Sequence, residues 1–407
     1  MNEWKEYTVQ DLIDQGMLAE PMDGNHGSIH PKSSDYVSEG VPFIMANDLV
    51  NGVVDLINCS FISEKQAKML KKGFAHPNDV LLTHKATIGR TAIVPNKYET
   101  IILTPQVTYY RVLKGIDNRY LKYYFDSDFF QNTLRNWAGS GSTRAYIGIT
   151  AQRKLPIILP PLNVQTKIAT VLSLLDEKIS LNIAINENLE QQAQAIFKAW
   201  FVDFEPFGGV MPDDWQDISV YDLADYINGT AFKKAEYGDS GFPIIKIAEL
   251  KSGITDSTQY CCVRKDDKYY IDDRDILFSW SGNPDTSIDT FLWSRGKAIL
   301  NQHTFRVVSK YNAPAFTYFL LKYLKPQFAH IASNKQTTGL GHVTVADLKR
   351  LQFCSNIATI NEFEVLAAPI FNAIFAIYKE NQHLADLRDT LLPKLMNGEI
   401  DVSAVEI

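Results

Sequence analysis

The sequence has few cysteines and lacks the features of exported or membrane-embedded proteins. Four cysteines occur in 407 residues, and no two are spaced as Cys-x-x-Cys, which argues against a disulfide framework or a zinc ribbon. No uninterrupted apolar run approaches the roughly 18 residues that a membrane span needs. The polar start, Met1–Glu6, lacks the cationic and apolar stretches of a signal peptide. We therefore expect a cytoplasmic protein without a membrane segment.

Recognisable catalytic motifs are also missing. The chain has no Gly-x-x-x-x-Gly-Lys-Ser/Thr loop to hold the phosphates of ATP. It has no Gly-x-Gly-x-x-Gly between a strand and a helix to seat an adenosyl or dinucleotide cofactor. Its eight histidines include no His-Glu-x-x-His pair. We expect a binding protein rather than an enzyme, with no catalytic site, no metal site and no cofactor bound by this chain.

The net charge of −7 is distributed unevenly along the chain. Residues 61–160 carry 15 Lys and Arg against 6 Asp and Glu, and residues 231–350 carry 17 against 12. Balances of +9 and +5 in these two blocks leave −21 for the rest of the chain. Two basic blocks in an acidic chain would offer DNA two separate contact regions. Chance unevenness across solvated surfaces is the alternative.

The chain contains two similar halves. The pattern Trp-x4-Val-x-Asp-Leu-x-Asp begins at Trp4 and again at Trp215, 211 residues later. Further matches follow at offsets that decrease in steps to 195, the separation of Asn186 and Asn381. Decreasing offsets are expected if the first copy has the longer loops. Because the period is too long for a solenoid repeat, it indicates two tandem units.

Each unit has the same predicted order of elements. Short β-rich runs come first, followed by a helical stretch, a loop rich in Gly, Ser and Thr, and a long closing helix. The helical stretches are expected near 120–136 and 315–332. The predicted fold class is α+β, a pseudo-twofold internal repeat of two tandem β-rich domains joined by two long helices. The predicted boundaries are 1–160 for the first domain, 161–205 for its helix, 206–356 for the second domain and 357–407 for its helix and tail.

The two closing helices have the hydrophobic spacing of a coiled coil. In each helix, apolar residues and asparagines recur at alternating intervals of three and four residues over about four heptads. These positions include Leu172, Leu175, Ile179, Asn182, Asn186 and Leu189 in the first helix and Ile374, Ile377, Asn381, Leu384 and Leu391 in the second. Packing of each helix on its own domain is the alternative.

Antiparallel pairing of these helices predicts a specific register. If facing residues have numbers that sum to 563, Asn182 pairs with Asn381 near the centre of the coiled coil. A central Asn pair lowers stability but disfavours shifted registers, because those would leave buried amides unpaired. Pro369 is expected to start or kink the second helix.

The order of several motifs on this doubled chain resembles the specificity (S) subunits of type I restriction–modification enzymes. The first half has Leu159-Pro-Pro-Leu-x-x-Gln165, Ile168-Ala-x-Val-Leu-x-x-Leu-Asp176-x-Lys-Ile179 and Ala199-Trp-Phe-Val-Asp-Phe204. The chain closes with Leu384-x-x-Leu-Arg388-x-x-Leu-Leu-Pro393-Lys-Leu-x-x-Gly398-Glu-Ile400. One departure is that the second unit lacks the Pro-Pro and Gln before its helix and has Cys354–Thr359 there.

The resemblance implies a division of labour between subunits. Each β-rich unit would be a target recognition domain that reads one half of a bipartite double-stranded DNA target, and an antiparallel coiled-coil spacer would fix the gap. The subunit itself would not be catalytic. Two modification (M) subunits would methylate adenine with S-adenosylmethionine, and two restriction (R) subunits would use ATP and magnesium for translocation and cleavage. A spacer of roughly 30 residues, about 45 Å long, suits half-sites about one helical turn apart.

Candidate DNA-contacting residues occupy equivalent regions of the two units. Arg, Lys, Asn and Gln read base edges, whereas Lys, Arg, hydroxyls and the amides of Gly-rich loops bind phosphates. On this chemistry the candidates are Lys85, Arg90, Ser142, Thr143 and Arg144 in the first unit and Asn283, Arg295, Lys335, Gln336, Thr337 and Thr338 in the second. A solvated surface role is the alternative for each.

Two other functions are alternatives to DNA recognition within a larger complex. One is a protein-interaction scaffold, which would retain no particular sequence from a randomised duplex pool. The other is a diverged, self-contained DNA methyltransferase or nuclease, against which the missing cofactor loop argues.

Overall fold

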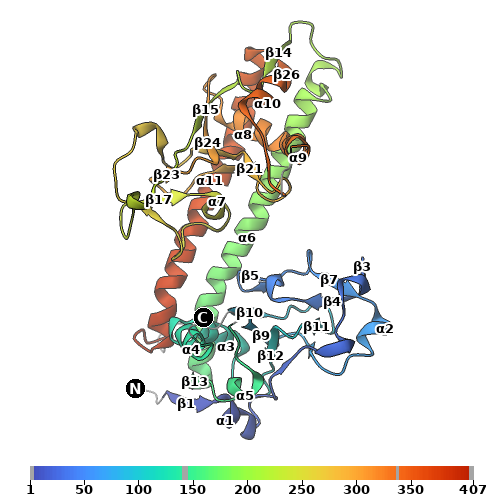
Figure 1. The fold of residues 1–407 in the computed structure, drawn as a ribbon, viewed down its shortest axis with the longest axis vertical. Coiled ribbons are helices and arrows are strands. Elements are labelled where there is room, and N and C mark those ends of the chain that lie inside the picture. The colour runs from blue at the N-terminus through green and yellow to red at the C-terminus, as the bar shows by residue number, and fades with distance from the viewer. Residues whose placement is uncertain (1–3, 140–144, 336–338, 403–407) are drawn as a thin grey trace. The chain divides into compact units, whose positions relative to one another are not determined.

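The computed structural model describes residues 4–139, 145–335 and 339–402. The chain forms two compact units, residues 1–177 with 385–407 (unit 1) and residues 178–384 (unit 2). Each unit contains a β-rich domain and part of two long helices, α6 (Leu162–Phe201) and α11 (Ile357–Met396) (Figure 1). The predicted fold class, two tandem β-rich domains with two long antiparallel helices, is confirmed.

The domain of unit 1 contains a six-stranded sheet in the order β2-β12-β9-β10-β6-β5 and a five-stranded sheet in the order β3-β7-β4-β11-β8. A separate antiparallel pair, β1 and β13, joins the start of the chain to the strand before α6. The strands are β1 Lys5–Thr8, β2 Met22–Asp23, β3 Tyr36–Val37, β4 Val41–Ile44, β5 Leu49–Val50, β6 Val53–Val54, β7 Ser60–Ile62, β8 Phe74–Ala75, β9 Val80–Lys85, β10 Thr87–Ile93, β11 Ile101–Leu103, β12 Val107–Tyr110 and β13 Pro156–Leu159.

The domain of unit 2 repeats this plan, but its first large sheet has four strands where that of unit 1 has six. Its sheets have the orders β15-β24-β20-β22 and β16-β18-β17-β23-β19, and β14 pairs with β26 as β1 does with β13. In both units one strand pair is parallel at the same place, β4 with β11 and β17 with β23. The strands are β14 Gln216–Ser219, β15 Ala224–Asn228, β16 Tyr237–Gly238, β17 Phe242–Ile245, β18 Tyr260–Cys261, β19 Tyr270–Ile271, β20 Ile276–Ser279, β21 Ser281–Gly282, β22 Asp289–Leu292, β23 Ala298–Leu300, β24 Thr304–Ser309, β25 Gly341–His342 and β26 Gln352–Ser355.

Each predicted helical stretch consists of two consecutive helices. In unit 1 the chain is extended at Ser127, whose Oγ accepts a hydrogen bond from the backbone N–H of Phe130 and thereby caps the second helix. In unit 2 the second helix begins one residue before Pro326, which suits the first turn of a helix. The short helices are α1 Val9–Asp14, α2 Glu64–Ala67, α3 Asn118–Asp126, α4 Asp128–Trp137, α5 Ile149–Gln152, α7 Ile247–Ser252, α8 Pro314–Tyr323, α9 Lys325–Ser333 and α10 Val345–Arg350.

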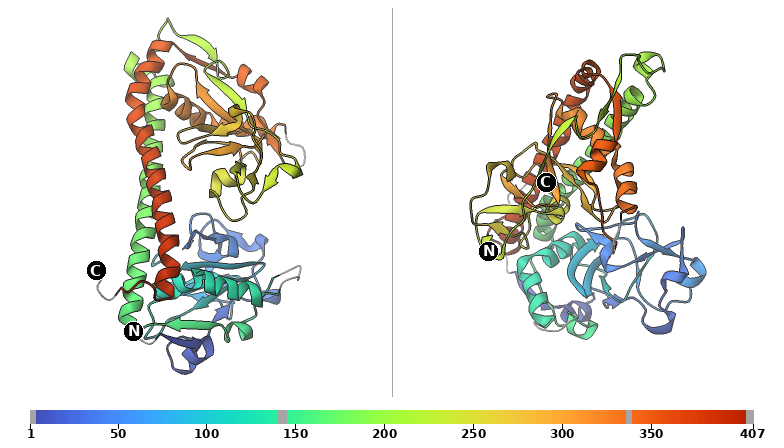
Figure 2. Two further views of the ribbon diagram at one scale, coloured as in Figure 1. Left: turned by 90° about the vertical axis from the view of Figure 1, so that its left-hand side faces the viewer. Right: turned by 45° about the horizontal axis from the view of Figure 1, so that its top comes forward.

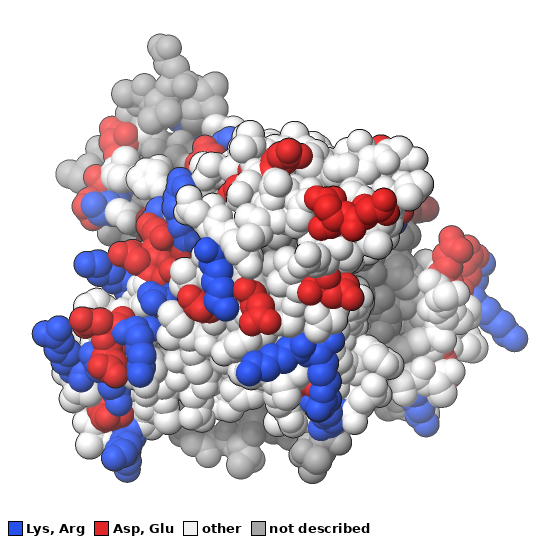
Figure 3. Space-filling model, turned by 90° about the horizontal axis from the view of Figure 1, so that it is seen from above, with Lys and Arg blue, Asp and Glu red and all other residues white. Residues whose placement is uncertain are grey.

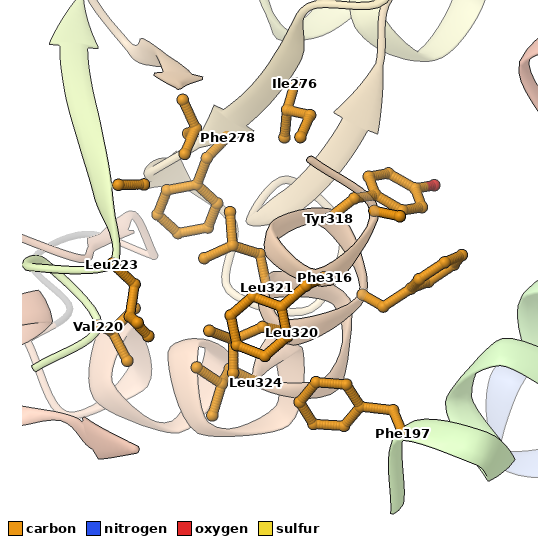
Figure 4. Close-up of a cluster of buried hydrophobic side chains, with 14 of the residues drawn as sticks. Phe197, Val220, Leu223, Ile276, Phe278, Phe316, Tyr318, Leu320, Leu321 and Leu324 are labelled. Carbon is orange, nitrogen blue, oxygen red and sulfur yellow. The ribbon is translucent and has the colours of Figure 1, made fainter. Parts of the chain in front are cut away.

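The long helices pack on the domains as well as on each other. In unit 2, Phe197 of α6 and Phe316 of α8 lie in one buried cluster with Phe278 of β20 (Figure 4). Phe363 and Phe371 of α11 are buried in the same cluster. Coiled-coil pairing and packing on the domain therefore occur together in the same helices, and the seam residue Ile374 is part of the domain core.

The two helices pair antiparallel in the predicted register (Figure 2). In unit 2 the Nδ2 of Asn182 donates to Oδ1 of Asn381 at 2.8 Å. The Nδ2 of Asn186 donates to the backbone oxygen of Ile374 at 3.4 Å. Of these side chains, those of Asn182 and Asn186 are almost fully buried. A shifted register would separate the amides from these acceptors.

Helix α11 begins at Ile357, the first residue of the predicted range 357–407. Pro369 lies inside the helix, so of the two roles expected for it, that of starting the helix is wrong. The reason is local, because Oδ1 of Asn356 accepts a 2.7 Å hydrogen bond from the backbone N–H of Thr359 and caps the helix there. By length and composition alone α11 could cross a membrane. Several of its apolar residues, Ile360 and Ile374 among them, are buried in the core of unit 2.

Candidate nucleic-acid interface

In unit 1 the hairpin of β9 and β10 contacts the residues that directly follow the Gly/Ser/Thr loop. Lys85 pairs with Tyr146, and the backbone N–H of Ala86 donates to the oxygen of Ala145 at 3.0 Å. The Nζ of Lys85 lies 5.8 Å from the ring centre of Tyr146, which is 50% exposed. The structure therefore brings Lys85 beside the residues that directly follow the loop. The candidates Ser142, Thr143 and Arg144 themselves lie outside the described residues.

Unit 2 has the same arrangement at the equivalent place. Strand β21 pairs with β25, and the backbone N–H of Val343 donates to the oxygen of Trp280 at 2.8 Å. This brings the turn that carries Asn283 beside the residues that follow the second loop. Gln336, Thr337 and Thr338 of that loop lie outside the described residues. The repeat in the sequence thus corresponds to a repeated pairing with the residues that follow each loop.

A polar cluster around the buried Asp23 includes His84, which lies on strand β9 of the unit 1 hairpin. Asp23 accepts hydrogen bonds from Lys72 and from Nε2 of His26, the latter at 2.9 Å. The Nε2 of His84 lies 3.9 Å from the same carboxylate, and its Nδ1 lies 3.0 Å from the oxygen of Ile147. Burial lowers the pKa of His84 below its ordinary value of 6.5. A neutral His84 can donate from Nδ1 to this oxygen and so holds the segment that follows the loop.

Two candidate residues have their polar atoms engaged within the protein. The Oδ1 of Asn283 accepts from the backbone N–H groups of Asp285 and Thr286 at 3.0 and 3.1 Å, which shapes the turn. The Nζ of Lys335 lies 2.5 Å from Oδ2 of Asp347, the residue that closes the capping box of α10. Although burial acts in the opposite direction, Lys335 and nearby hydrogen bonds lower the pKa of Asp347. Lys335 therefore has a structural partner.

The two remaining arginine candidates differ in position. Arg90 is on the β9–β10 hairpin with Lys85, and its Nη1 lies 3.3 Å from the oxygen of Ala46. Arg295 follows β22 at the end where Leu292 pairs with Ile276, whereas Asn283 lies beyond the opposite end of β20. An added Cβ on Gly253 would lie 2.4 Å from the guanidinium of Arg295. The structure therefore separates Arg295 from the other candidates of unit 2.

Comparison with known proteins identifies the family. The family model described as the type I restriction modification DNA specificity domain matches residues 1–191 and 212–354, and so both units. The chain belongs to this family. It is similar to the type I restriction enzyme MjaIX specificity subunit of Methanocaldococcus jannaschii, with 27% identity over 98% of this chain and 94% of that protein. It is also similar to the HindI specificity subunit of Haemophilus influenzae, with 23% identity over 98% and 100%.

A solved structure has the same fold. The S subunit of a type I restriction–modification system from M. genitalium has a TM-score of 0.56 and 15% identity, covering 97% of this chain and 96% of that one. This likeness concerns the fold, whereas the family model that matches both units shows that the chain is a type I restriction–modification specificity protein. The resemblance inferred from the sequence motifs is confirmed.

The structure of this specificity subunit adds candidates that sequence reasoning missed. Helices α4 and α9 each lead into a Gly/Ser/Thr loop, and each exposes an amide followed three residues later by a basic side chain. These are Asn132 and Arg135 in unit 1 and Gln327 and His330 in unit 2. In unit 1 the Nη2 of Arg135 donates to Oδ1 of Asn132 at 2.7 Å. Both pairs are separated by 195 residues, an offset already visible in the sequence.

Charges of both signs are interspersed on the face of the molecule that is seen from above. On this face Lys and Arg side chains lie among Asp and Glu side chains and do not form one continuous basic area (Figure 3).

Proposed function

We propose that each unit reads one part of a bipartite duplex target and that the paired helices α6 and α11 set the gap between the two parts. The observation that carries this proposal is the repeated loop pairing, β9–β10 with Tyr146 in unit 1 and β21 with β25 in unit 2. Each pairing joins the end of a strand pair or turn to the residues that follow a Gly/Ser/Thr loop. The Asn182–Asn381 pair supports a spacer of one register.

Within each unit, phosphate contacts and base contacts would come from different elements. Lys85 and the Gly/Ser/Thr loop following α4 would bind the backbone, since an ammonium and loop amides suit phosphates. The Asn132–Arg135 and Gln327–His330 pairs would face base edges, because amide and guanidinium groups form bidentate hydrogen bonds with bases. Changing Asn132 and Arg135 to Ala would then relax base preference in one half of the target and leave the other half unchanged.

Catalysis would come from partner subunits. Two modification subunits would bring S-adenosylmethionine, and two restriction subunits would bring ATP and magnesium, so this chain would bind no cofactor of its own. The complex would act in the cytoplasm. Exposed apolar residues on the long helices in unit 2 would receive a modification subunit, because apolar side chains on an exposed helix face favour contact with another helix. These are Leu181 and Ile185 on α6 and Val365 and Leu366 on α11.

A selection from random duplexes tests the proposal. The chain, assembled with its modification subunit, is incubated with a randomised DNA pool, and bound duplexes are sequenced at several salt concentrations. We expect enrichment of two short sequence blocks at one fixed separation, with affinity that falls as salt rises. Enrichment of no sequence would contradict the proposal and favour an interaction scaffold. Binding of S-adenosylmethionine by the isolated chain would favour a self-contained methyltransferase.

A further inference from the structure

Two tyrosines at matching positions of the repeat bond their domains to the same long helix. Tyr123 of α3 and Tyr318 of α8 are 195 residues apart. In unit 1 the hydroxyl of Tyr123 donates to Oδ2 of Asp176 at 2.6 Å. In unit 2 the hydroxyl of Tyr318 donates to Oε1 of Glu190 at 2.6 Å. Both carboxylates belong to α6, so each recognition domain has a direct polar bond to the spacer.

In unit 1 the Asp176 carboxylate joins three elements, and we call Tyr123, Lys122, Asp126, Asp176 and Arg388 the Asp176 cluster. Lys122 of α3 lies 3.6 Å from Asp176 and 2.9 Å from Asp126. Arg388 of α11 donates to Oδ1 of Asp176 at 2.8 Å. Although burial acts in the opposite direction, these neighbours lower the pKa of Asp176. The carboxylate therefore links the recognition domain to both spacer helices.

In unit 2 the same arrangement is built around Glu190, with Tyr318, Lys322, Asp289 and Tyr378 (the Glu190 cluster). Lys322 of α8 lies 3.7 Å from Glu190 and 3.5 Å from Asp289. The hydroxyl of Tyr378 on α11 lies 3.5 Å from Oε1 of Glu190. As in unit 1, a tyrosine and a lysine from the domain and one residue from α11 meet at a carboxylate of α6.

Apart from the tyrosine, the two clusters do not use equivalent positions. The residues 195 positions from Lys122, Asp176 and Arg388 are Thr317, Phe371 and Ala193, respectively. The same arrangement is thus formed twice from different residues. Apolar packing alone would hold the domains against the helices, as Phe197 and Phe316 do. Partly buried hydrogen-bonded charges add geometric selectivity, because a small displacement leaves them unpaired.

We propose that Tyr123 and Tyr318 are positioning residues that fix how each recognition domain is seated on the spacer and thereby restrict the gap length that the subunit accepts. This inference rests on the proposed function, in which the spacer sets the gap. The tyrosines act through Asp176 and Glu190 and do not touch DNA. Without either hydroxyl, the domain still packs on the helices but tolerates small displacements along them.

The test uses Tyr123→Phe and Tyr318→Phe in the complex with the modification subunit. The substrates are duplexes with the two half-sites selected by the wild-type complex, at the preferred gap and at gaps one base pair shorter or longer. Tyr110→Phe and Tyr226→Phe are matched controls, because these hydroxyls donate within the domains, to Gln152 and to the oxygen of Val220. We expect methylation at the altered gaps, relative to the preferred gap, to rise roughly tenfold in the test variants and not in the controls.

The unfolding midpoint of each variant separates positioning from stability. An unchanged gap profile in Tyr123→Phe and Tyr318→Phe, with midpoints lowered as in the controls, would overturn the proposal. If Tyr123→Phe does not fold, Asp176→Ala removes the acceptor of the Tyr123 hydroxyl, and the same relaxation is expected. The wild-type complex separates the two possible failures. If it binds a bipartite target at one gap but the variants keep its gap profile, only this inference fails. If it binds no bipartite target, the proposed function fails.

Discussion

The Nδ2 of Asn182 donates a 2.8 Å hydrogen bond to Oδ1 of Asn381 and a second, also of 2.8 Å, to Oε2 of Glu380. Asn182 is 1% exposed, so its amide depends on these acceptors. One side chain on α6 thus recognises two consecutive residues of α11. The contact makes one alignment of the antiparallel helices more favourable than its neighbours.

The stability of the paired helices should depend on whether one or both of Asn182 and Asn381 are replaced. Asn182→Leu alone leaves the Asn381 amide without its partner, whereas Asn182→Leu with Asn381→Leu replaces both polar groups. We expect the double variant to exceed the single variant in free energy of unfolding by about 1–3 kcal/mol, measured by chemical denaturation. A double variant less stable than Asn182→Leu would contradict this assignment of the pair.

The stability of unit 1 should depend on pH through His84. Burial lowers the pKa of His84, so below pH 6.5 the unfolded chain binds a proton that the folded chain does not. Stability is therefore expected to fall as pH decreases from 6.5, by at most about 1.4 kcal/mol per pH unit for this one group. His30, whose pKa burial also lowers, adds a contribution of the same sign.

The comparison that isolates His84 is the difference between wild type and His84→Gln. Unfolding free energies measured from pH 7.5 to 5 should give a shallower slope in the variant, with the slope from His30 retained. Equal slopes in the two proteins would show that His84 titrates normally in the folded state.

The C-terminal tail should stabilise unit 1 specifically. Val402 is 2% exposed and belongs to the core cluster of unit 1, against which Ile400 also packs. Gly398 lies beside the ring of Trp4, because a Cβ added there would be 3.3 Å from it. We expect Val402→Ala to cost about 1–3 kcal/mol and to raise hydrogen exchange in unit 1. Val210→Ala, at a site that is 70% exposed, should change neither, and exchange changes confined to unit 2 would contradict the prediction.

Salt dependence should distinguish Lys85 from Arg295. Lys85 pairs with Tyr146, which follows the Gly/Ser/Thr loop of unit 1, whereas Arg295 lies at the opposite end of the β20–β22 pair from Asn283. Lys85→Ala should reduce the slope of log affinity against log salt by about 0.9, the value for one phosphate contact. Arg295→Ala should leave it unchanged. A reduced slope in Arg295→Ala would contradict this prediction and indicate that Arg295 contacts DNA.

The architecture was largely predictable from the sequence, because it is determined by patterns that extend over many residues. The repeat, the heptads of α6 and α11 and the pairing of Asn182 with Asn381 all follow from spacings sustained over many residues. The break at Ser127 could not be predicted, because a single capping residue decides that helix boundary. The parallel pairing of β4 with β11 could not be predicted either, because strands of two to four residues have little periodic signal.

The candidate site was predictable in its location but only partly in its residues. The sequence placed Lys85 and the Gly/Ser/Thr loops in equivalent regions, and the structure brings their flanking residues together. The sequence could not reveal that Lys335 pairs with Asp347, twelve residues away, or that Arg295 lies at the other end of a strand pair. Such contacts depend on tertiary packing, which spacing along the chain does not encode.

The most direct test of two-part recognition is to map methylated adenines in a genome that expresses this chain with its modification subunit. The account predicts one motif of two blocks separated by a constant number of unspecified bases. It further predicts that exchanging the β-rich domain of unit 1 for that of a relative changes one block only. A continuous motif, or a chimera in which both blocks change, would contradict it.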